Sequence, residues 1–277
     1  MTKTAAPMTS GSIWKQMTFF AMPIFLGNLF QQLYNTVDSL IVGNFLGSSA
    51  LAAVSSSGSL IFMLIGFLSG ISAGAGVIVA RFFGAGDEKN LQRAVHTTVA
   101  FGLVAGVLMT GVGVALSPQI LRWMDTPESV MRESVTYLQI YFAGSLGFVM
   151  YNVLVGILQA VGDSRHPLYY LIVSSVINLV LDLLFITGFH TGVGGAAVAT
   201  VISQIVSALL CFWQLLRTKE SYGLKIRKIR FDKGILVQII KIGLPSGVQN
   251  SIIAFANVIV QSNINAFGEM AMAGYGA

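Results

Sequence analysis

The stretch NLFQQLYNTVDSLIVGNFLG, residues 28–47, places one acid in a largely apolar neighbourhood. Polar residues recur through it at steps of three and four, at Asn28, Gln31, Asn35 and Asp38, with Tyr34 beside them. Residues three and four positions apart share one face of an α-helix, so the stretch predicts a helix with a single polar face. A charge at the centre of a membrane helix costs about 2.5–3.5 kcal/mol, and such residues are usually functional.

The composition around this stretch is that of a membrane protein. Of the 277 residues, 55% are hydrophobic and only 10% are charged, whereas a soluble domain carries about 25% charged residues. Apolar segments of about 20 residues or more are long enough to cross the membrane, and only as helices. We expect such segments at 17–42, 51–80, 94–116, 134–158, 168–189, 195–216 and 236–266. The predicted fold class is an all-α membrane protein.

The cationic residues are divided unequally between the two sides of this predicted topology. Of the 16 Lys and Arg residues, all but Arg122 and Arg132 lie near the N-terminus, near the start of the seventh segment, or in the linkers after the second, fourth and sixth segments. The positive-inside rule therefore predicts a multi-pass protein of the cell membrane with a cytoplasmic N-terminus. We interpret the basic linker at 217–235 as a topology determinant on an anionic leaflet rather than a nucleic-acid site.

The seventh segment resembles the first. Residues 21–53 align with residues 243–274, so that Pro23 matches Pro245, Asn28 matches Asn250, Asn35 matches Asn257 and, after a one-residue deletion, Gly47 matches Gly268. Internal repeats with a site between them are typical of transporters. We therefore expect a six-helix transmembrane lobe at 1–216, a cytoplasmic linker at 217–235, and at 236–277 the first helix of a second, truncated lobe. The missing remainder of that lobe would be required for a complete transporter.

Only two of the 11 acids, Asp38 and Asp182, lie deep in apolar segments, and no Lys or Arg is comparably deep. Each must be protonated, paired with a cation or exposed to water. Two more segments carry polar residues at helical steps: Ser174, Asn178 and Asp182 on one, Thr200 and Gln204 on the other. Such faces favour a wet cavity, and their oxygen ligands suit Na⁺. Hydrogen bonding between helices is the alternative for Ser174, Gln204 and Asn28.

The order and spacing of these motifs resemble the multidrug and toxic compound extrusion (MATE) family. The resemblance rests on the Pro23 to Asp38 spacing and on QAVGDSRHP at 159–167, INLVLDLLFI at 177–186 and GVGGAAVATVISQ at 192–204. It implies two six-helix lobes that export organic cations and drugs in exchange for Na⁺ or H⁺, with no other cofactor. The lack of Lys or Arg deep in the apolar segments favours cationic or neutral organic cargo, and the lack of a Ser/His/Asp or metal-hydrolase pattern predicts no enzymatic activity.

The resemblance also implies the site residues. It places the coupling-ion site, including a possible Na⁺ site, at Asp38, Asn178, Asp182 and Thr200. It places a substrate path at Gln31, Tyr34 and Asn152, to which we add Asn35 from the same helix face as Gln31. The expected partners are membrane lipid and a small drug-like substrate, without nucleic acid.

Two other functions remain open. A lipid-linked oligosaccharide flippase of related architecture would need Lys or Arg to bind its anionic pyrophosphate, and none lies deep in the apolar segments. A non-transporting membrane subunit would leave two buried carboxylates without a role.

Overall fold

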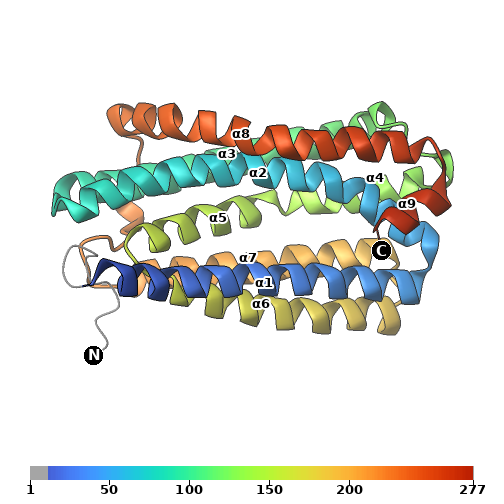
Figure 1. The fold of residues 1–277 in the computed structure, drawn as a ribbon, viewed down its shortest axis with the longest axis horizontal. Coiled ribbons are helices and arrows are strands. Elements are labelled where there is room, and N and C mark those ends of the chain that lie inside the picture. Colours follow the sequence, from blue (N-terminus) through green and yellow to red (C-terminus); the bar gives the residue numbers. More distant parts are fainter. Residues whose placement is uncertain (1–11, 277) are drawn as a thin grey trace.

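The computed structural model describes residues 12–276, and every regular element in that range is helical. The helices lie side by side along one direction in an elongated bundle (Figure 1). In chain order they are α1 (Ile13–Leu46), α2 (Ser48–Gly84), α3 (Glu88–Trp123), α4 (Glu128–Ala143), α5 (Ser145–Ala160), α6 (Arg165–Leu183), the π-helix η1 (Leu184–Gly188), α7 (Val193–Arg217), the 3₁₀-helix η2 (Ile226–Lys228), α8 (Lys233–Asn265) and α9 (Glu269–Gly276). This architecture confirms the predicted all-α fold class.

Five helices are long and apolar enough to cross a membrane, namely α2, α3, α6 with η1, α7 and α8. The pair α4 and α5 makes a sixth span if the two are counted together, but the pair is bent by 50°. The predicted segment 134–158 is therefore broken, at Gly144. A Cβ atom at Gly144 would lie 2.4 Å from Cγ1 of Val201 on α7, so the glycine admits a close approach of α7 at the break.

The first predicted span differs from the other six. α1 has 34 residues, about 51 Å of helix, but it is not among the helices that are apolar enough to span by composition. The reason is its polar face, which lowers its hydropathy although the helix is long. Pro23 lies inside α1 and not at its entry.

The two ends of the bundle differ in charge. The basic end is where α1, α3, α6 and α8 begin and where α7 ends (Figure 1). Asp87 caps α3 at this end by accepting a hydrogen bond from the backbone N–H of Asn90 at 3.1 Å. Hydrogen bonds from the backbone and side chain of Asn90 hold the pKa of the Asp87 carboxyl below its usual value.

The backbone repeats where the sequence does. Gly47 follows α1 with φ of 89°, and Gly268 follows α8 with φ of 90°. No neighbouring atom would meet a Cβ at either position, so the left-handed conformation alone favours glycine there. A new helix starts directly after each, and Pro23 and Pro245 both lie inside their helices. The aligned copies therefore have the same local structure.

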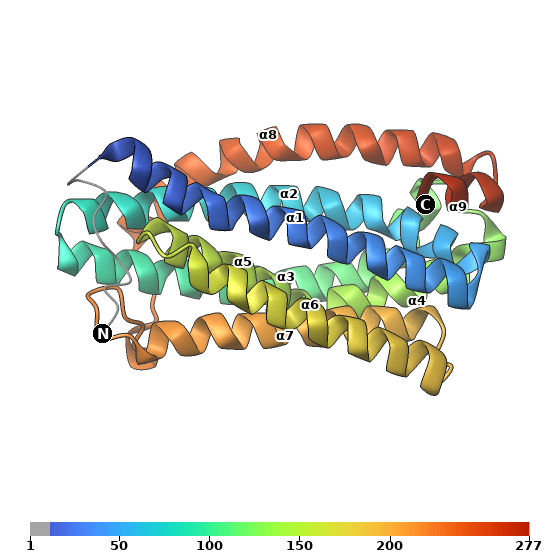
Figure 2. The same ribbon diagram turned by 60° about the horizontal axis from the view of Figure 1, so that its bottom comes forward.

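α8 packs closely along α2, as both ribbon views show (Figures 1 and 2). A Cβ at Gly70 would lie 2.2 Å from the backbone nitrogen of Gly247, and one at Gly74 would lie 2.4 Å from Cα of Gly243. Helices approach this closely only where small residues meet. The two backbones therefore touch directly over this part of their length.

Farther along the same helix pair, towards the end opposite the basic end, the contact becomes polar. Ser59 Oγ donates to Gln261 Oε1 at 3.3 Å, and Gln261 Nε2 donates to Asn265 Oδ1 at 2.9 Å. Asn265 Nδ2 in turn donates to the carbonyl of Met124 at 2.9 Å and to Ser56 Oγ at 3.4 Å. Gln261 and Asn265 are 0% and 1% exposed, so this network ties α8 to α2 and to the end of α3 without access to water.

Candidate functional site

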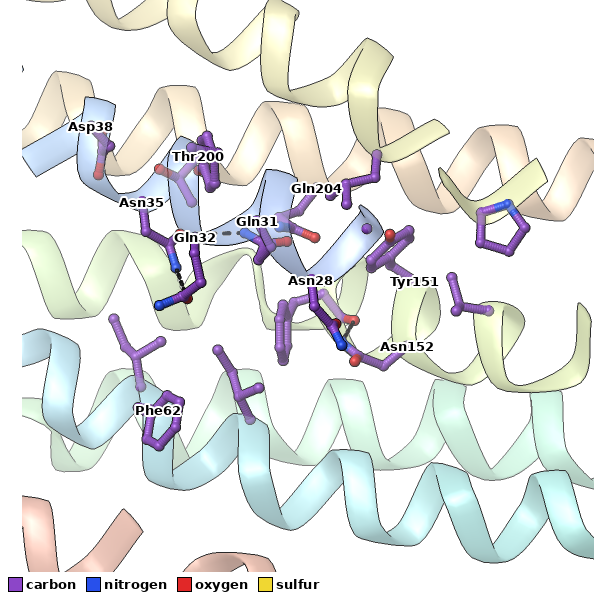
Figure 3. A pocket seen from close by; sticks show the side chains of 18 of the residues that line it. Asn28, Gln31, Gln32, Asn35, Asp38, Phe62, Tyr151, Asn152, Thr200 and Gln204 are labelled. Atoms are coloured by element: carbon purple, nitrogen blue, oxygen red, sulfur yellow. Dashed lines mark hydrogen bonds between the residues drawn. The ribbon is translucent and has the colours of Figure 1, made fainter. Parts of the chain in front are cut away.

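A cavity of about 510 Å³ lies beside α1, between that helix and side chains of α2, α4, α5, α6 and α7 (Figure 3). The four predicted substrate-path residues Gln31, Tyr34, Asn35 and Asn152 all line it. So do Asp38 and Thr200 of the predicted ion site. Among the lining residues, all within the described range 12–276, Asp38 is the one acid and none is Lys or Arg.

The polar face of α1 is ordered by its own amides. Gln31 Nε2 donates to Asn35 Oδ1 at 3.3 Å, and Asn35 Nδ2 donates to Gln32 Oε1 at 3.4 Å. Figure 3 shows these side chains beside one another on α1, with Asp38 farther along the helix. This helix therefore presents oriented donors and acceptors to the cavity as well as its carboxylate.

Asp38 and Asp182 meet although 143 residues of chain separate them. Their carboxyl groups lie close enough for each to act electrostatically on the other. Asp182 is 0% exposed and does not line the cavity, whereas Asp38 is partly buried and does. A cation that enters the cavity would thus reach Asp38 first, with Asp182 behind it.

The oxygens of this pair lack donors. Within residues 12–276, no N–H or O–H group donates a hydrogen bond to Asp38 Oδ1 or to either carboxylate oxygen of Asp182. Two buried carboxylates at close range repel each other unless a positive charge or a shared proton lies between them. The arrangement therefore fits a site that takes up a proton or a small cation.

The other two predicted ion-site residues lie next to this pair. Asn178 Nδ2 donates to Thr200 Oγ1 at 3.5 Å, and the Tyr34 hydroxyl lies within hydrogen-bond reach of the Thr200 side chain. Asn178 and Thr200 are 1% and 7% exposed. The site thus combines carboxylate, amide and hydroxyl oxygens, the ligand types that suit a hard cation. The role of these four residues remains a prediction.

Asp182 lies immediately before an irregular stretch of helix. α6 ends at Leu183 and continues as the π-helix η1, a wide turn that is rare and frequently found at functional sites. Two threonines hold the turn: Thr187 Oγ1 donates to Leu183 O at 2.5 Å, and Thr191 Oγ1 donates to Phe185 O at 2.8 Å. The sequence around Asp182 did not indicate this turn.

The remaining polar residues named from the sequence separate into two groups. Asn28 and Gln204 line the cavity, and Gln204 Oε1 meets no donor in the described range. Ser174 instead is buried and donates to the carbonyl of Leu171 at 2.9 Å, within its own helix. Within residues 12–276, none of the three side chains forms a hydrogen bond to another helix, so the interhelical alternative finds no support at these positions.

Sequence reasoning missed the aromatic wall of the cavity. Tyr137 and Tyr141 both line it, and their rings stack with centroids 6.5 Å apart. Their spacing of four in a segment predicted as helix was a usable signal. Phe62 and Tyr151 also line the cavity (Figure 3), but neither belongs to a periodic polar pattern.

Comparisons with known proteins agree on one family. The family model described as MatE matches residues 23–184. The probable multidrug resistance protein YoeA of Bacillus subtilis (strain 168) is 35% identical over 272 residues, which cover 96% of this chain and 59% of YoeA. The probable multidrug resistance protein YpnP of the same organism is 33% identical, with 99% of this chain and 61% of YpnP covered. The chain therefore spans about three-fifths of the length of these relatives.

Solved structures of the same kind are similar in fold. An inward-facing multidrug resistance MATE family transporter is 29% identical, with a TM-score of 0.82. The match covers 89% of this chain and 56% of the transporter's chain. An outward-facing one is 27% identical with a TM-score of 0.84, and covers 93% of this chain and 57% of its own.

Proposed function

Because this chain belongs to the MatE family of multidrug and toxic compound extrusion transporters, we propose that it acts in a secondary active transporter, which exports drug-like organic compounds in exchange for Na⁺ or H⁺. The observation that carries the proposal is the donor-free Asp38–Asp182 pair beside a cavity of about 510 Å³. Members of this family are transporters and not enzymes, so we assign the chain no catalytic activity.

The cavity chemistry supports neutral or cationic organic cargo. Its walls combine aromatic rings such as Tyr137 and Tyr141 with amides such as Gln31 and Asn152. Aromatic faces attract cations and stack on planar rings, while the amides both donate and accept hydrogen bonds. A pyrophosphate-linked cargo, as in the flippase alternative, would meet Asp38 and no Lys or Arg among the described lining residues.

In this proposal, the coupling arises because the ion and the cationic cargo compete for the negative charge of Asp38. Asp38 lines the cavity and also contacts buried Asp182, so an ion bound between them removes negative charge from the cargo space. Cationic cargo then loses its electrostatic attraction and is released. Discharge of the ion restores the attraction, and an inward ion gradient supplies the free energy. Proton and Na⁺ coupling share this logic, because either one removes one negative charge from the pair.

The orientation is part of the same proposal. The basic end, where α7 ends and α8 begins, carries the excess of Lys and Arg, which favours the cytoplasmic side. On this orientation Asp38, in the half of α1 away from the basic end, lies nearer the exterior. Ions from outside then have the shorter route to the pair.

The test imposes the two gradients separately. Vesicles that carry the product of the complete gene containing this sequence are loaded with ethidium, and efflux is followed with a Na⁺ gradient, a pH gradient or neither. Efflux that accelerates with one gradient only identifies the coupling ion. Equal efflux under all three conditions would refute ion-coupled export.

A further inference from the structure

The strap, residues 217–233, joins α7 to α8 across the basic end and carries a concentrated positive charge (Figure 1). It contains seven Lys and Arg residues and two acids, a formal charge of +5, which equals the formal net charge of the whole chain. In the transport proposed above, this charge only sets the orientation of the chain in the membrane.

One side of the strap is anchored in the apolar core. Tyr222 and Leu224 are 2% and 3% exposed and belong to the same core cluster as side chains of α2, α3, α5 and α7. The Tyr222 ring meets the Phe83 ring edge-on, with centroids 6.1 Å apart. The backbone N–H of Leu224 donates to the carbonyl of Leu215 at 2.8 Å. The strap is thus held by burial and not only by its ends.

Side chains of α3 hold the strap backbone at a series of points. Gln92 Nε2 donates to the carbonyls of Ser221 and Gly223, His96 Nε2 accepts from the backbone N–H of Lys225 at 3.1 Å, and Thr97 Oγ1 accepts from that of Asp232 at 3.1 Å. His96 and Thr97 are 3% and 0% exposed. The strap therefore has a defined inner face towards α3.

The outer face combines cations with exposed apolar side chains. Ile226 and Phe231 are 60% and 46% exposed. Around them lie five exposed cations, none of which forms an ion pair within the described residues: Lys225, Arg227, Lys228, Arg230 and Lys233. Trp213, near the end of α7, is also exposed and lies under the Arg217 guanidinium at 5.0 Å. Together these side chains form a surface of fixed cations with apolar tips.

We propose that the outer face of the strap binds the anionic phospholipid headgroups of the leaflet beside the basic end. The strap joins two helices that are each apolar enough to span a membrane, so it lies at headgroup level. Polybasic segments beside a membrane helix attract anionic lipids, and exposed apolar and aromatic side chains insert at the interface. A leaflet offers anionic headgroups and an apolar acyl boundary together, so lipid fits both features.

The test places a fluorescent reporter on the strap of the full chain. Ile226→Trp, with Phe231→Trp as a second probe, is reconstituted in phosphatidylcholine vesicles containing one-fifth phosphatidylglycerol. Quenching by brominated phosphatidylglycerol is compared with quenching by brominated phosphatidylcholine at equal mole fraction. The fluorescence of the protein's own tryptophans, measured without the added reporter, is subtracted first. We expect a roughly fivefold preference for the anionic lipid for each cation that engages a headgroup, and loss of that preference at high salt.

A matched pair of variants assigns the effect. K225Q/R227Q/K228Q in the reporter background removes three strap cations, and R122Q/R132Q removes the two exposed cations of the opposite end. The first variant should lose the preference and the second should retain it. Equal quenching by both brominated lipids in the parent reporter, or an undiminished preference in the strap variant, would overturn the proposal. Binding of an added acidic protein or RNA without lipid preference would likewise overturn it in favour of a soluble partner.

Discussion

α1 and α8 share a sequence pattern and a backbone but have different surroundings. Both have a proline inside the helix and a glycine with φ near 90° after it. α1 directs Asp38 and a row of amides into a cavity. α8 has Val260 where Asp38 would align and no acid beside it, and it places the next residue, Gln261, in a buried network against α2.

The two copies of the repeat thus share the path of the backbone, but their helices make different contacts. Asp38 of α1 is a carboxylate without donors and requires an outside partner such as an ion, whereas Gln261, one residue beyond the aligned position in α8, finds its partners within the protein. The same frame therefore gives a charge-dependent site in one copy and a fixed contact in the other.

The largest effect is expected at the acid. Asp38→Asn in the complete gene product should reduce ion-driven ethidium efflux to the level of vesicles without the protein. The reason is that an amide at the cavity wall carries no negative charge and binds neither a proton nor a cation as a carboxylate does. Val260→Asn introduces the same amide at the corresponding position of α8 and should leave efflux unchanged. Normal efflux by Asp38→Asn at normal membrane insertion would show that the pair is not the coupling site.

The second effect concerns the close contact of α8. Gly70→Ala would place a Cβ 2.2 Å from the backbone of Gly247, and overpacking against backbone that cannot rotate away should cost about 3 kcal/mol. The measurement is the apparent melting temperature in detergent. Gly58→Ala on the same helix meets no atom within 4 Å, so its melting temperature should stay the same or rise. Equal behaviour of the two variants would contradict the close contact.

The third effect concerns the buried amides. Asn265→Leu would leave the Met124 carbonyl and the Gln261 amide without their partner, at a cost of about 2 kcal/mol. Asn263→Leu is the control, since Asn263 is exposed and bonds only within its own helix. Denaturation by detergent or heat should separate the two variants. If both unfold alike, the network does not stabilise α8 on α2.

The smallest effect is expected at the helix starts. Asp232 caps α8 by accepting from the backbone N–H of Ile235 at 3.1 Å, whereas Ser12 makes no side-chain cap on α1. Asp232→Ala should therefore cost about 1 kcal/mol, and Ser12→Ala should cost nothing measurable. Hydrogen exchange in the first turn of each helix would detect the difference. Faster exchange in α1 than in α8 of the parent protein is the corresponding expectation.

Much of the site followed from spacing along one helix. The steps from Asn28 to Asp38 predicted a shared polar face, and that face does line the cavity. The meeting of Asp38 with Asp182 was implied by the family resemblance and by the scarcity of deep acids. The periodicity of polar residues indicates which of them share one face of a helix. It therefore predicts the lining of a cavity correctly wherever the helix is regular.

The irregular features could not be predicted in the same way. The break at Gly144 depends on Val201, a residue far along the chain that occupies the space beside it. The π-helix after Asp182 and the partners of Asn265 likewise arise from tertiary contacts. Glycine and asparagine are ordinary residues in membrane helices, so their presence alone does not distinguish a break or a buried network from simple packing.

The break at Gly144 divides one wall of the cavity between two helices. Tyr137 and Tyr141 lie on α4, and Tyr151 and Asn152 lie on α5. Two helices that are bent by 50° relative to each other therefore line the same cavity. Val201 of α7 occupies the space that a side chain at Gly144 would need, so the angle between the two parts of this wall depends on a residue that does not itself line the cavity.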